Sequence, residues 1–243
     1  MFMQKLITFI LAILSLQTMQ GQAQIKSITG AINDLYFVGR APEKSTSNAP
    51  AIILLHGYGS NEQDLFALAP QMPGNYYVFS LRAPFKIGAD QYQWYEIKRS
   101  AGNIEINFEQ EELSRKKLIN FIDELVIKYK LNKSKIIVAG FSQGGILAEA
   151  IGLTAPEKVA GVACFSGRYL NELKPMIKSK AQLQNKKIFL AHGTQDQLLA
   201  INLAEENYKA LTNLGLKVTY KKDNIGHSIS AVLLREFNLW LLE

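Results

Sequence analysis

Cysteine and histidine are scarce in this chain of 243 residues, which contains one cysteine and three histidines. A single cysteine excludes an intramolecular disulfide, so the fold must depend on its hydrophobic core. That cysteine, Cys164, lies in the apolar run 159–165, where a thiol is typical of an inert core residue and not of a nucleophile. With 48% hydrophobic and 20% charged residues, the composition is that of a globular protein with one sizeable core.

The N-terminus lacks an apolar run long enough to span a membrane. Residues 6–16 are predominantly apolar, well short of the ~18 residues that a spanning helix needs. With Lys5 before this run and the small residue Ala23 after it, the pattern predicts a secretory signal peptide over residues 1–23. An uncleaved membrane anchor is the alternative. We therefore expect an exported protein, periplasmic or secreted, with one domain over residues 24–243 and no stable membrane anchor.

Strong clustering of charge is also absent. The formal net charge is +6, and the lysines are scattered, with loose clusters within residues 128–135 and 174–187. Neither cluster contains interleaved aromatic residues or a nucleic-acid motif, so a solvated surface is expected and a nucleic-acid partner is not. A mild attraction to anionic surfaces is compatible with this charge. The sequence does not predict an oligomeric state.

Apolar β-branched runs alternate with amphipathic runs along most of the chain. Continuous apolar runs are typical of strands buried on both faces, and apolar residues at helical spacing are typical of helices packed on such strands. Their alternation predicts an α/β fold with a mostly parallel central sheet, helices on both faces and no large cap domain. We expect strands within residues 28–38, 51–55, 76–81, 136–139, 159–165, 187–191 and 218–221, and helices near 62–68, 109–130, 146–155, 201–214 and 230–242.

One strand, turn and helix contain the motif of a catalytic serine. The strand at residues 136–139 leads into Gly140-Phe141-Ser142-Gln143-Gly144-Gly145, and a helix-forming run follows. A Gly-x-Ser-x-Gly in this context is a nucleophile elbow, in which a strained turn exposes the serine at the edge of the sheet. The glycines let strand and helix pass closely without a Cβ clash. The sequence therefore predicts Ser142 as a nucleophile.

A serine nucleophile needs a base and an acid that orients the base. In α/β-hydrolases the order along the chain is serine, acid, histidine, so His227 is the predicted base. His56 and His192 each end a strand and are predicted to be structural. Asp196 directly follows a buried strand, at the carboxyl edge where open α/β sheets bind their ligands, and is the predicted acid. The alternative acid is a turn residue, Asp223.

Two backbone N–H groups are candidates for an oxyanion hole. This fold takes one donor from the residue after the nucleophile and the other from the loop after its third strand. These positions are Gln143 and, in the run His56-Gly57-Tyr58-Gly59, Tyr58. We expect the main-chain groups of Tyr58 and Gln143, and not their side chains, to be the donors.

At these residues the sequence resembles the phospholipase/carboxylesterase family of α/β-hydrolases, which includes small carboxylesterases and acyl-protein thioesterases. The resemblance covers most of residues 24–243. It rests on the runs 56–65, Arg82-Ala83-Pro84, Trp94-Tyr95, 140–145, 192–196 and Gly226-His227.

The resemblance implies a compact hydrolase of carboxylic esters or thioesters that uses no metal and no cofactor. It also implies that Trp94, Leu198 and Leu199 line the substrate pocket. The chain departs from the family at Gln197, where a proline usually follows the acid, and in its export signal, which makes a role in removing palmitate from cytosolic proteins unexpected.

These features predict a serine carboxylesterase with a Ser-His-Asp triad and an acyl-enzyme intermediate. Lysophospholipase, thioesterase and phenolic-ester hydrolase activities of the feruloyl type are alternatives within the same chemistry. Two alternatives are not enzymes: a catalytically silent α/β-hydrolase that binds a ligand, and a basic protein that binds anionic surfaces. For each of the enzyme activities, the expected partner is a small-molecule ester.

Overall fold

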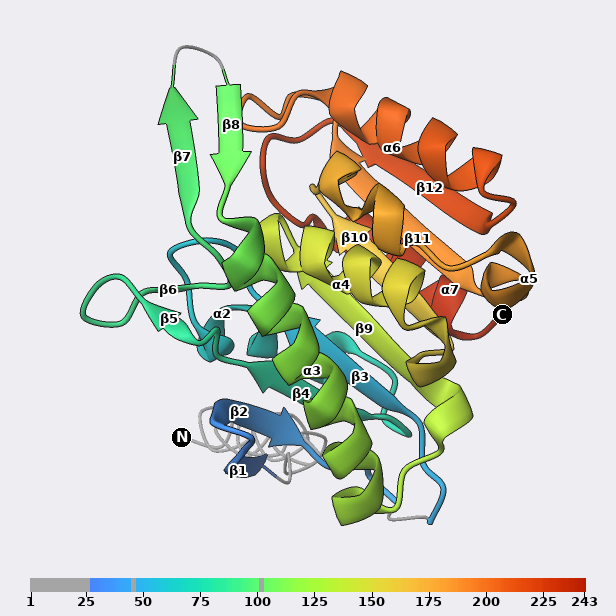
Figure 1. Cartoon of the computed structure of the whole chain (residues 1–243). Helices are drawn as coiled ribbons and strands as arrows, with labels where there is room; N and C mark the ends of the chain where they lie inside the picture. The colour runs from blue at the N-terminus through green and yellow to red at the C-terminus, as the bar shows by residue number, and fades with distance from the viewer. Residues whose placement is uncertain (1–26, 45–46, 101–102) are drawn as a thin grey trace, which may run out of the picture.

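The computed structural model describes residues 27–44, 47–100 and 103–243, so the predicted signal peptide lies outside the described residues. Its main feature is an eight-stranded sheet in the order β1-β2-β4-β3-β9-β10-β11-β12 (Figure 1). β2 is antiparallel to both of its neighbours, and the strands from β4 to β12 in this order are parallel. The predicted, mostly parallel α/β sheet is confirmed. The strands are β1 (Ser27–Ile32), β2 (Leu35–Arg40), β3 (Ala51–Leu55), β4 (Tyr77–Leu81), β9 (Ile136–Phe141), β10 (Gly161–Phe165), β11 (Lys187–Gly193) and β12 (Lys217–Asp223).

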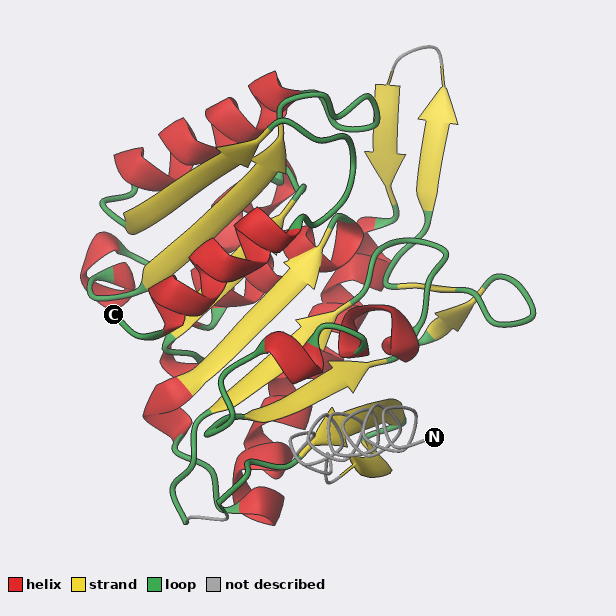
Figure 2. Ribbon diagram, turned by 180° about the vertical axis from the view of Figure 1, so that it is seen from behind, coloured by secondary structure: helices red, strands yellow, loops and turns green. Residues whose placement is uncertain are grey.

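Helices cover both faces of the sheet, as Figure 2 shows from behind. Alternate residues of each strand point to opposite faces, so Ile53 packs in the core layer that contains α3, α4 and α6, and Ile52 packs in the layer that contains α2 and α7. None of the described helices is both long and apolar enough to cross a membrane. The helices are α2 (Glu62–Phe66), α3 (Phe108–Tyr129), α4 (Gln143–Thr154), α5 (Lys180–Leu183), α6 (Ile201–Asn213) and α7 (Ala231–Leu241), with short 3-10 segments η1 (Ala69–Gln71), η2 (Lys133–Lys135), η3 (Pro156–Lys158) and η4 (Asn171–Met176).

The long helix α3 begins and ends where its sequence predicts. The side chain of Asn107 caps its N-terminus by accepting a hydrogen bond from the backbone N–H of Gln110. Lys130 ends it in the left-handed conformation, with φ of 51°. Leu118 and Phe121 are buried on the face toward the sheet, which confirms the amphipathic interpretation of this run.

The stretch after Pro84, which the sequence predicts only as irregular, forms two small hairpins. They are β5 (Phe85–Lys86) with β6 (Tyr92–Gln93), and β7 (Ile97–Ser100) with β8 (Asn103–Ile106). Strands of two and four residues are too short for an alternating pattern to be recognised. In Figure 1 the hairpin β7–β8 projects from the body at the end toward which β9 points.

Candidate active site

The turn between β9 and α4 holds Ser142 in a strained conformation. Its φ is 52° and its ψ is −116°, a region that a residue with a side chain rarely adopts. Its N–H donates to the carbonyl oxygen of Phe165 at 2.8 Å. A side-chain carbon at Gly144 would overlap the carbonyl group of Leu55, so only glycine allows the helix to pass this close to β3. This geometry is that of the predicted nucleophile elbow.

Asp196 and His227 form a direct hydrogen bond. Nδ1 of His227 lies 2.6 Å from Oδ2 of Asp196, although 31 residues separate them in the sequence. Because carboxylate oxygens only accept, Nδ1 carries the proton and Nε2 is free to act as a base. The imidazole ring also packs on Phe141, with ring centroids 4.8 Å apart. The pair thus presents a basic nitrogen beside the elbow.

The carboxylate of Asp196 is held by several donors. Its Oδ1 accepts hydrogen bonds from the N–H groups of Leu198 and Leu199, each at 2.9 Å. Burial raises the pKa of Asp196. The hydrogen bonds from Leu199, His227 and Leu198 together lower it by more than burial raises it, so the pKa lies below its usual value. The carboxylate that accepts the hydrogen bond from His227 is therefore negatively charged. The same bonds hold the loop at Gln197 without the proline that the family usually has there.

Ser142 and His227 line one cavity of about 590 Å³ at the carboxyl end of the sheet. No hydrogen bond joins their side chains within the described part of the chain; such bonds are often long in enzymes without substrate and shorten on binding. Of the predicted pocket residues, Leu198 and Leu199 line this cavity. Its walls consist of Gly57, Tyr58, Tyr95, Ile97, Ile106, Phe141, Ser142, Gln143, Ile146, Arg168, Leu198, Leu199 and His227.

The two predicted oxyanion donors also border the cavity. Gln143 is the first residue of α4, where backbone N–H groups have no partner within the helix. Among the described residues, no acceptor binds the N–H of Gln143 or that of Tyr58. Tyr58 is 53% exposed as a residue. Both N–H groups are available to an oxygen that enters beside Ser142.

The side chain of Gln143 has a second role that the sequence did not predict. Its Oε1 accepts a hydrogen bond from the N–H of Trp94 at 2.9 Å, and its Nε2 donates to the carbonyl oxygen of Tyr95 at 2.6 Å. This amide therefore binds the elbow to the segment before β7. The sequence contains no signal for this contact, because the partners are backbone groups about fifty residues away.

Trp94 lies elsewhere than predicted: it is fully buried and is not part of the cavity wall. Its indole Nε1 donates to the carbonyl oxygen of His56 at 2.9 Å, and its own carbonyl accepts from the Ser114 hydroxyl at 2.5 Å. The polar end of the indole is thus used to support the loop that carries Tyr58. The neighbouring Tyr95 lines the cavity instead.

The other histidines have the structural contacts that the sequence predicts. Nδ1 of His56 lies 2.7 Å from the carbonyl oxygen of Gly57, and Nε2 of His56 accepts a hydrogen bond from the N–H of Ala83. Burial lowers the pKa of His56, which favours this neutral form. Nε2 of His192 lies 2.7 Å from the carbonyl oxygen of Leu199 and 3.3 Å from Oδ2 of Asp196. His192 therefore lies against the acid, a contact that sequence order alone did not reveal.

The alternative acid, Asp223, does not contact His227. Its Oδ2 accepts from the hydroxyl of Ser230 at 2.5 Å, and its Oδ1 accepts from the N–H of Asn224. Asp223 is thus a turn residue before α7.

The loop that carries Tyr58 is followed by a half-buried ion pair. Arg82, at the end of β4, binds both carboxylate oxygens of Glu62 at 2.6 and 2.5 Å. Its guanidinium also lies over the rings of Tyr36 and Tyr92. Burial raises the pKa of Glu62, but its hydrogen bonds with Arg82 outweigh this and lower it.

Within the described residues there is no group of three or more side chains suited to hold a metal ion.

Comparison with known proteins agrees with this geometry. A family model described as phospholipase/carboxylesterase matches residues 40–241. The chain is 31% identical over 124 residues to acyl-protein thioesterase 1 of Aspergillus fumigatus, which covers 48% of this chain and 52% of that protein. It is 25% identical over 214 residues to a rice protein named probable inactive carboxylesterase, covering 82% of this chain and 87% of the rice protein.

The chain spans about half the length of the first curated relatives that it matches. The similarity to solved structures covers a larger part of the chain. The carboxylesterase of Bacillus cereus superposes with a TM-score of 0.73 at 24% identity, covering 85% of this chain and 93% of that structure. The fold is thus the α/β-hydrolase fold, and the chain belongs to the phospholipase/carboxylesterase family.

Proposed function

We propose that the protein is a serine carboxylesterase that acts through Ser142, His227 and Asp196. The observation that carries the proposal is the hydrogen bond between Asp196 and His227 beside a cavity that Ser142 also lines. A nucleophile, a base and a group that orients the base are the components that acyl transfer requires.

In the first half of the proposed reaction, Nε2 of His227 takes the proton of Ser142 as its oxygen attacks the ester carbonyl carbon. The negative charge that develops on the carbonyl oxygen is stabilised by the N–H groups of Tyr58 and Gln143. Asp196 stabilises the imidazolium cation. His227 then gives its proton to the departing alcohol, which leaves the acyl group bound to Ser142.

In the second half, water replaces the alcohol. His227 takes a proton from the water, and the hydroxide attacks the acyl carbonyl carbon. The oxyanion again forms between Tyr58 and Gln143, and collapse of the tetrahedral intermediate returns the proton to Ser142 and releases the carboxylic acid. The chain itself supplies each of these groups.

The cavity walls favour an acyl group with apolar carbons. Ile97, Ile106 and Ile146 contribute aliphatic surface beside Ser142. Burial of each methylene on such surface stabilises binding by about 0.8 kcal/mol. Thioesters are a second candidate substrate class, because a relative named acyl-protein thioesterase 1 is 31% identical over 124 residues. Export through residues 1–23 is part of the proposal and rests on the sequence pattern alone.

The test is hydrolysis of 4-nitrophenyl esters graded by acyl length, with a thioester, a lysophospholipid and a feruloyl ester beside them. Ser142→Ala is expected to lose activity toward every substrate that the native protein cleaves. Labelling by a fluorophosphonate is expected at Ser142. A native protein that neither hydrolyses these substrates nor is labelled would instead favour a catalytically silent binding protein.

A further inference from the structure

Arg168 lines two cavities of the structure. It follows β10 at the carboxyl end of the sheet and lines the cavity of Ser142. It also lines a second cavity of about 640 Å³, whose walls include residues of η4 and α6. It is the one residue common to the two linings among the described residues. A group bound to Arg168 can therefore be part of a molecule that reaches Ser142.

The charge of Arg168 is not compensated within the described part of the chain. No carboxylate lies within 4.0 Å of it there, and its one hydrogen bond runs from Nη1 to the carbonyl oxygen of Tyr169 at 3.1 Å. A guanidinium is always charged and has five N–H donors. By contrast, Arg82 and Arg115 each bind a buried glutamate, and Arg40 donates to four carbonyl oxygens.

The turn before Arg168 is held in an unfavourable conformation. Ser166 has φ of 51°, although it is not glycine, and its buried hydroxyl has no hydrogen-bond partner among the described residues. At Gly167, a side-chain carbon would overlap the sulfur of Cys164. Strained backbone and unpaired polar groups are disfavoured in a fold, and they concentrate where function requires them. This strained turn places Arg168 in the cavity wall.

The surroundings of Arg168 supply further donors and positive charge. Tyr95 lines the same cavity wall, and its buried hydroxyl has no partner among the described residues. Burial raises the pKa of Tyr95, while the nearby charge of Arg168 opposes the increase, so the hydroxyl keeps its proton, although the hydroxyl itself is shielded from the cavity. On the other side, the second cavity contains Lys174, Lys178 and Lys180 against one acid, Glu206.

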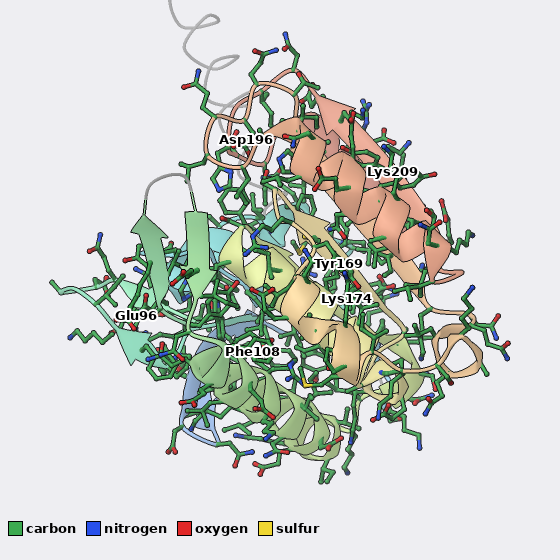
Figure 3. All side chains as sticks on the ribbon, turned by 45° about the horizontal axis from the view of Figure 1, so that its top comes forward. Glu96, Phe108, Tyr169, Lys174, Asp196 and Lys209 are labelled. Carbon is green, nitrogen blue, oxygen red and sulfur yellow. The ribbon has the colours of Figure 1, made fainter. Side chains whose placement is uncertain are left out.

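In Figure 3, Tyr169 and Lys174, two residues that line the second cavity, lie between α3 and α6. An apolar acyl substrate would use the isoleucine walls of the first cavity but would leave the guanidinium without a partner. Arg168 is half-buried, so covering it with an apolar group would remove water from an unpaired charge, whereas an anion at this point would form charge-assisted hydrogen bonds.

We propose that the ester substrate carries an anionic group, a carboxylate or a phosphate, and that Arg168 binds this group while the ester lies at Ser142. Arg168 is thus a specificity-determining residue, with the lysines of the second cavity contributing further positive charge. The proposal rests on the proposed esterase function and adds the charge of the substrate to it.

The experiment compares neutral and anionic esters of matched size. For an anion on the acyl side, the pair is the 4-nitrophenyl monoester of glutarate and 4-nitrophenyl pentanoate, with spontaneous hydrolysis subtracted. For an anion on the alcohol side, the pair is a 1-acylglycerol 3-phosphate and the 1-acylglycerol with the same acyl chain. The variants are Arg168→Met, Arg168→Lys and the control Lys209→Met, which removes an exposed positive charge of α6 that lines neither cavity.

For at least one pair, Arg168→Met is expected to raise KM for the anionic ester about tenfold or more, since a hydrogen bond to a charged group is lost. The neutral ester of that pair is expected to change by less than about twofold, because methionine replaces arginine in the cavity wall with an uncharged side chain of similar length and the neutral ester has no anion to lose a hydrogen bond from. Arg168→Lys should restore part of the affinity, and Lys209→Met should resemble the native protein. Whichever pair responds identifies the anion as carboxylate or phosphate.

Calorimetric titration with glutarate and with glycerol 3-phosphate tests the same site without catalysis. Binding that is present in the native protein and in Lys209→Met, and lost in Arg168→Met, would support the proposal even if no ester were cleaved. Equal effects of Arg168→Met on both esters of each pair, or the absence of anion binding and of any preference for anionic esters, would overturn it. Hydrolysis of neutral esters that depends on Ser142 would then still support the esterase function.

Discussion

Asn207 of α6 donates a hydrogen bond from Nδ2 to Oε2 of Glu149 on α4 at 2.7 Å, and both side chains are buried. Burial raises the pKa of Glu149 to about 8, although the bond from Asn207 opposes the increase. Oδ1 of Asn207 has no partner among the described residues. The helix α4, which follows Ser142, therefore contains a buried carboxyl group that keeps its proton at neutral pH.

This carboxyl group predicts a pH dependence of stability. The unfolded chain loses the proton of Glu149 near its ordinary pKa of 4.5, whereas the folded chain keeps it until about 8. Between these values the folded state binds more protons, so the free energy of unfolding falls as the pH rises. The decrease is expected to be on the order of a few kcal/mol. Urea denaturation at several pH values measures it.

Glu149→Gln should remove most of this decrease, because an amide does not titrate. Glu124→Gln is a suitable control, since Glu124 is exposed on α3. Native and Glu149→Gln proteins with parallel stability curves between pH 4.5 and 8 would contradict the prediction.

Asp196→Asn is predicted to lower kcat by about 10³- to 10⁴-fold, because an amide favours the wrong tautomer of the histidine. The cavity walls remain, so KM should change little. Steady-state kinetics with a 4-nitrophenyl ester measures both constants. Asp223→Asn serves as the control and should retain nearly native kcat, since Asp223 bonds to Ser230 and not to His227.

Two substitutions at Tyr58 separate its backbone from its side chain. Tyr58→Pro removes the N–H donor and is predicted to lower kcat by about 10²- to 10³-fold. Tyr58→Ala keeps the donor and removes only the ring of a residue that is 53% exposed, so kcat should stay close to native. Thermal unfolding of both variants controls for loss of the fold. Equal kcat values for the two variants would exclude the Tyr58 N–H as an oxyanion donor.

Gln143→Ala tests the contact between the elbow and the segment before β7. It leaves the backbone N–H in place but removes the bonds to Trp94 and Tyr95. Two buried backbone groups then lack partners, at about 1–3 kcal/mol each. We expect a lower melting temperature and a reduced kcat/KM.

Gln110→Ala is the matched control for Gln143→Ala. Its Oε1 accepts from the N–H of Glu96 at 2.8 Å, on the same segment, but neither Gln110 nor Glu96 is part of the cavity wall. This variant should be less destabilised, because the bond is exposed, and should retain native kcat/KM. A loss of kcat/KM as large as that of Gln143→Ala would mean that any disturbance of the segment is sufficient.

Sequence order and strand periodicity were enough to predict the sheet and to bring Ser142, Asp196 and His227 to one end of it. Residues directly after parallel strands share an edge, and this rule does not require knowledge of packing. The contacts of Gln143 and the position of Arg168 depend on how irregular segments approach the elbow. Trp94 was misplaced for the same reason, since an aromatic residue in a loop suits a pocket wall and a buried support equally well.

The cavity walls come from two independent parts of the chain. The proposed reacting groups lie at strand ends and are constrained by contacts such as that between Gly144 and Leu55, whereas Ile97 and Ile106 are a directly paired couple on the hairpin β7–β8, outside the main sheet. Substrate preference can therefore diverge through substitutions in the hairpin while the chemistry is preserved. In directed evolution of this enzyme scaffold, Ile97 and Ile106 are the positions to randomise together, and Gly144 is the position to leave unchanged.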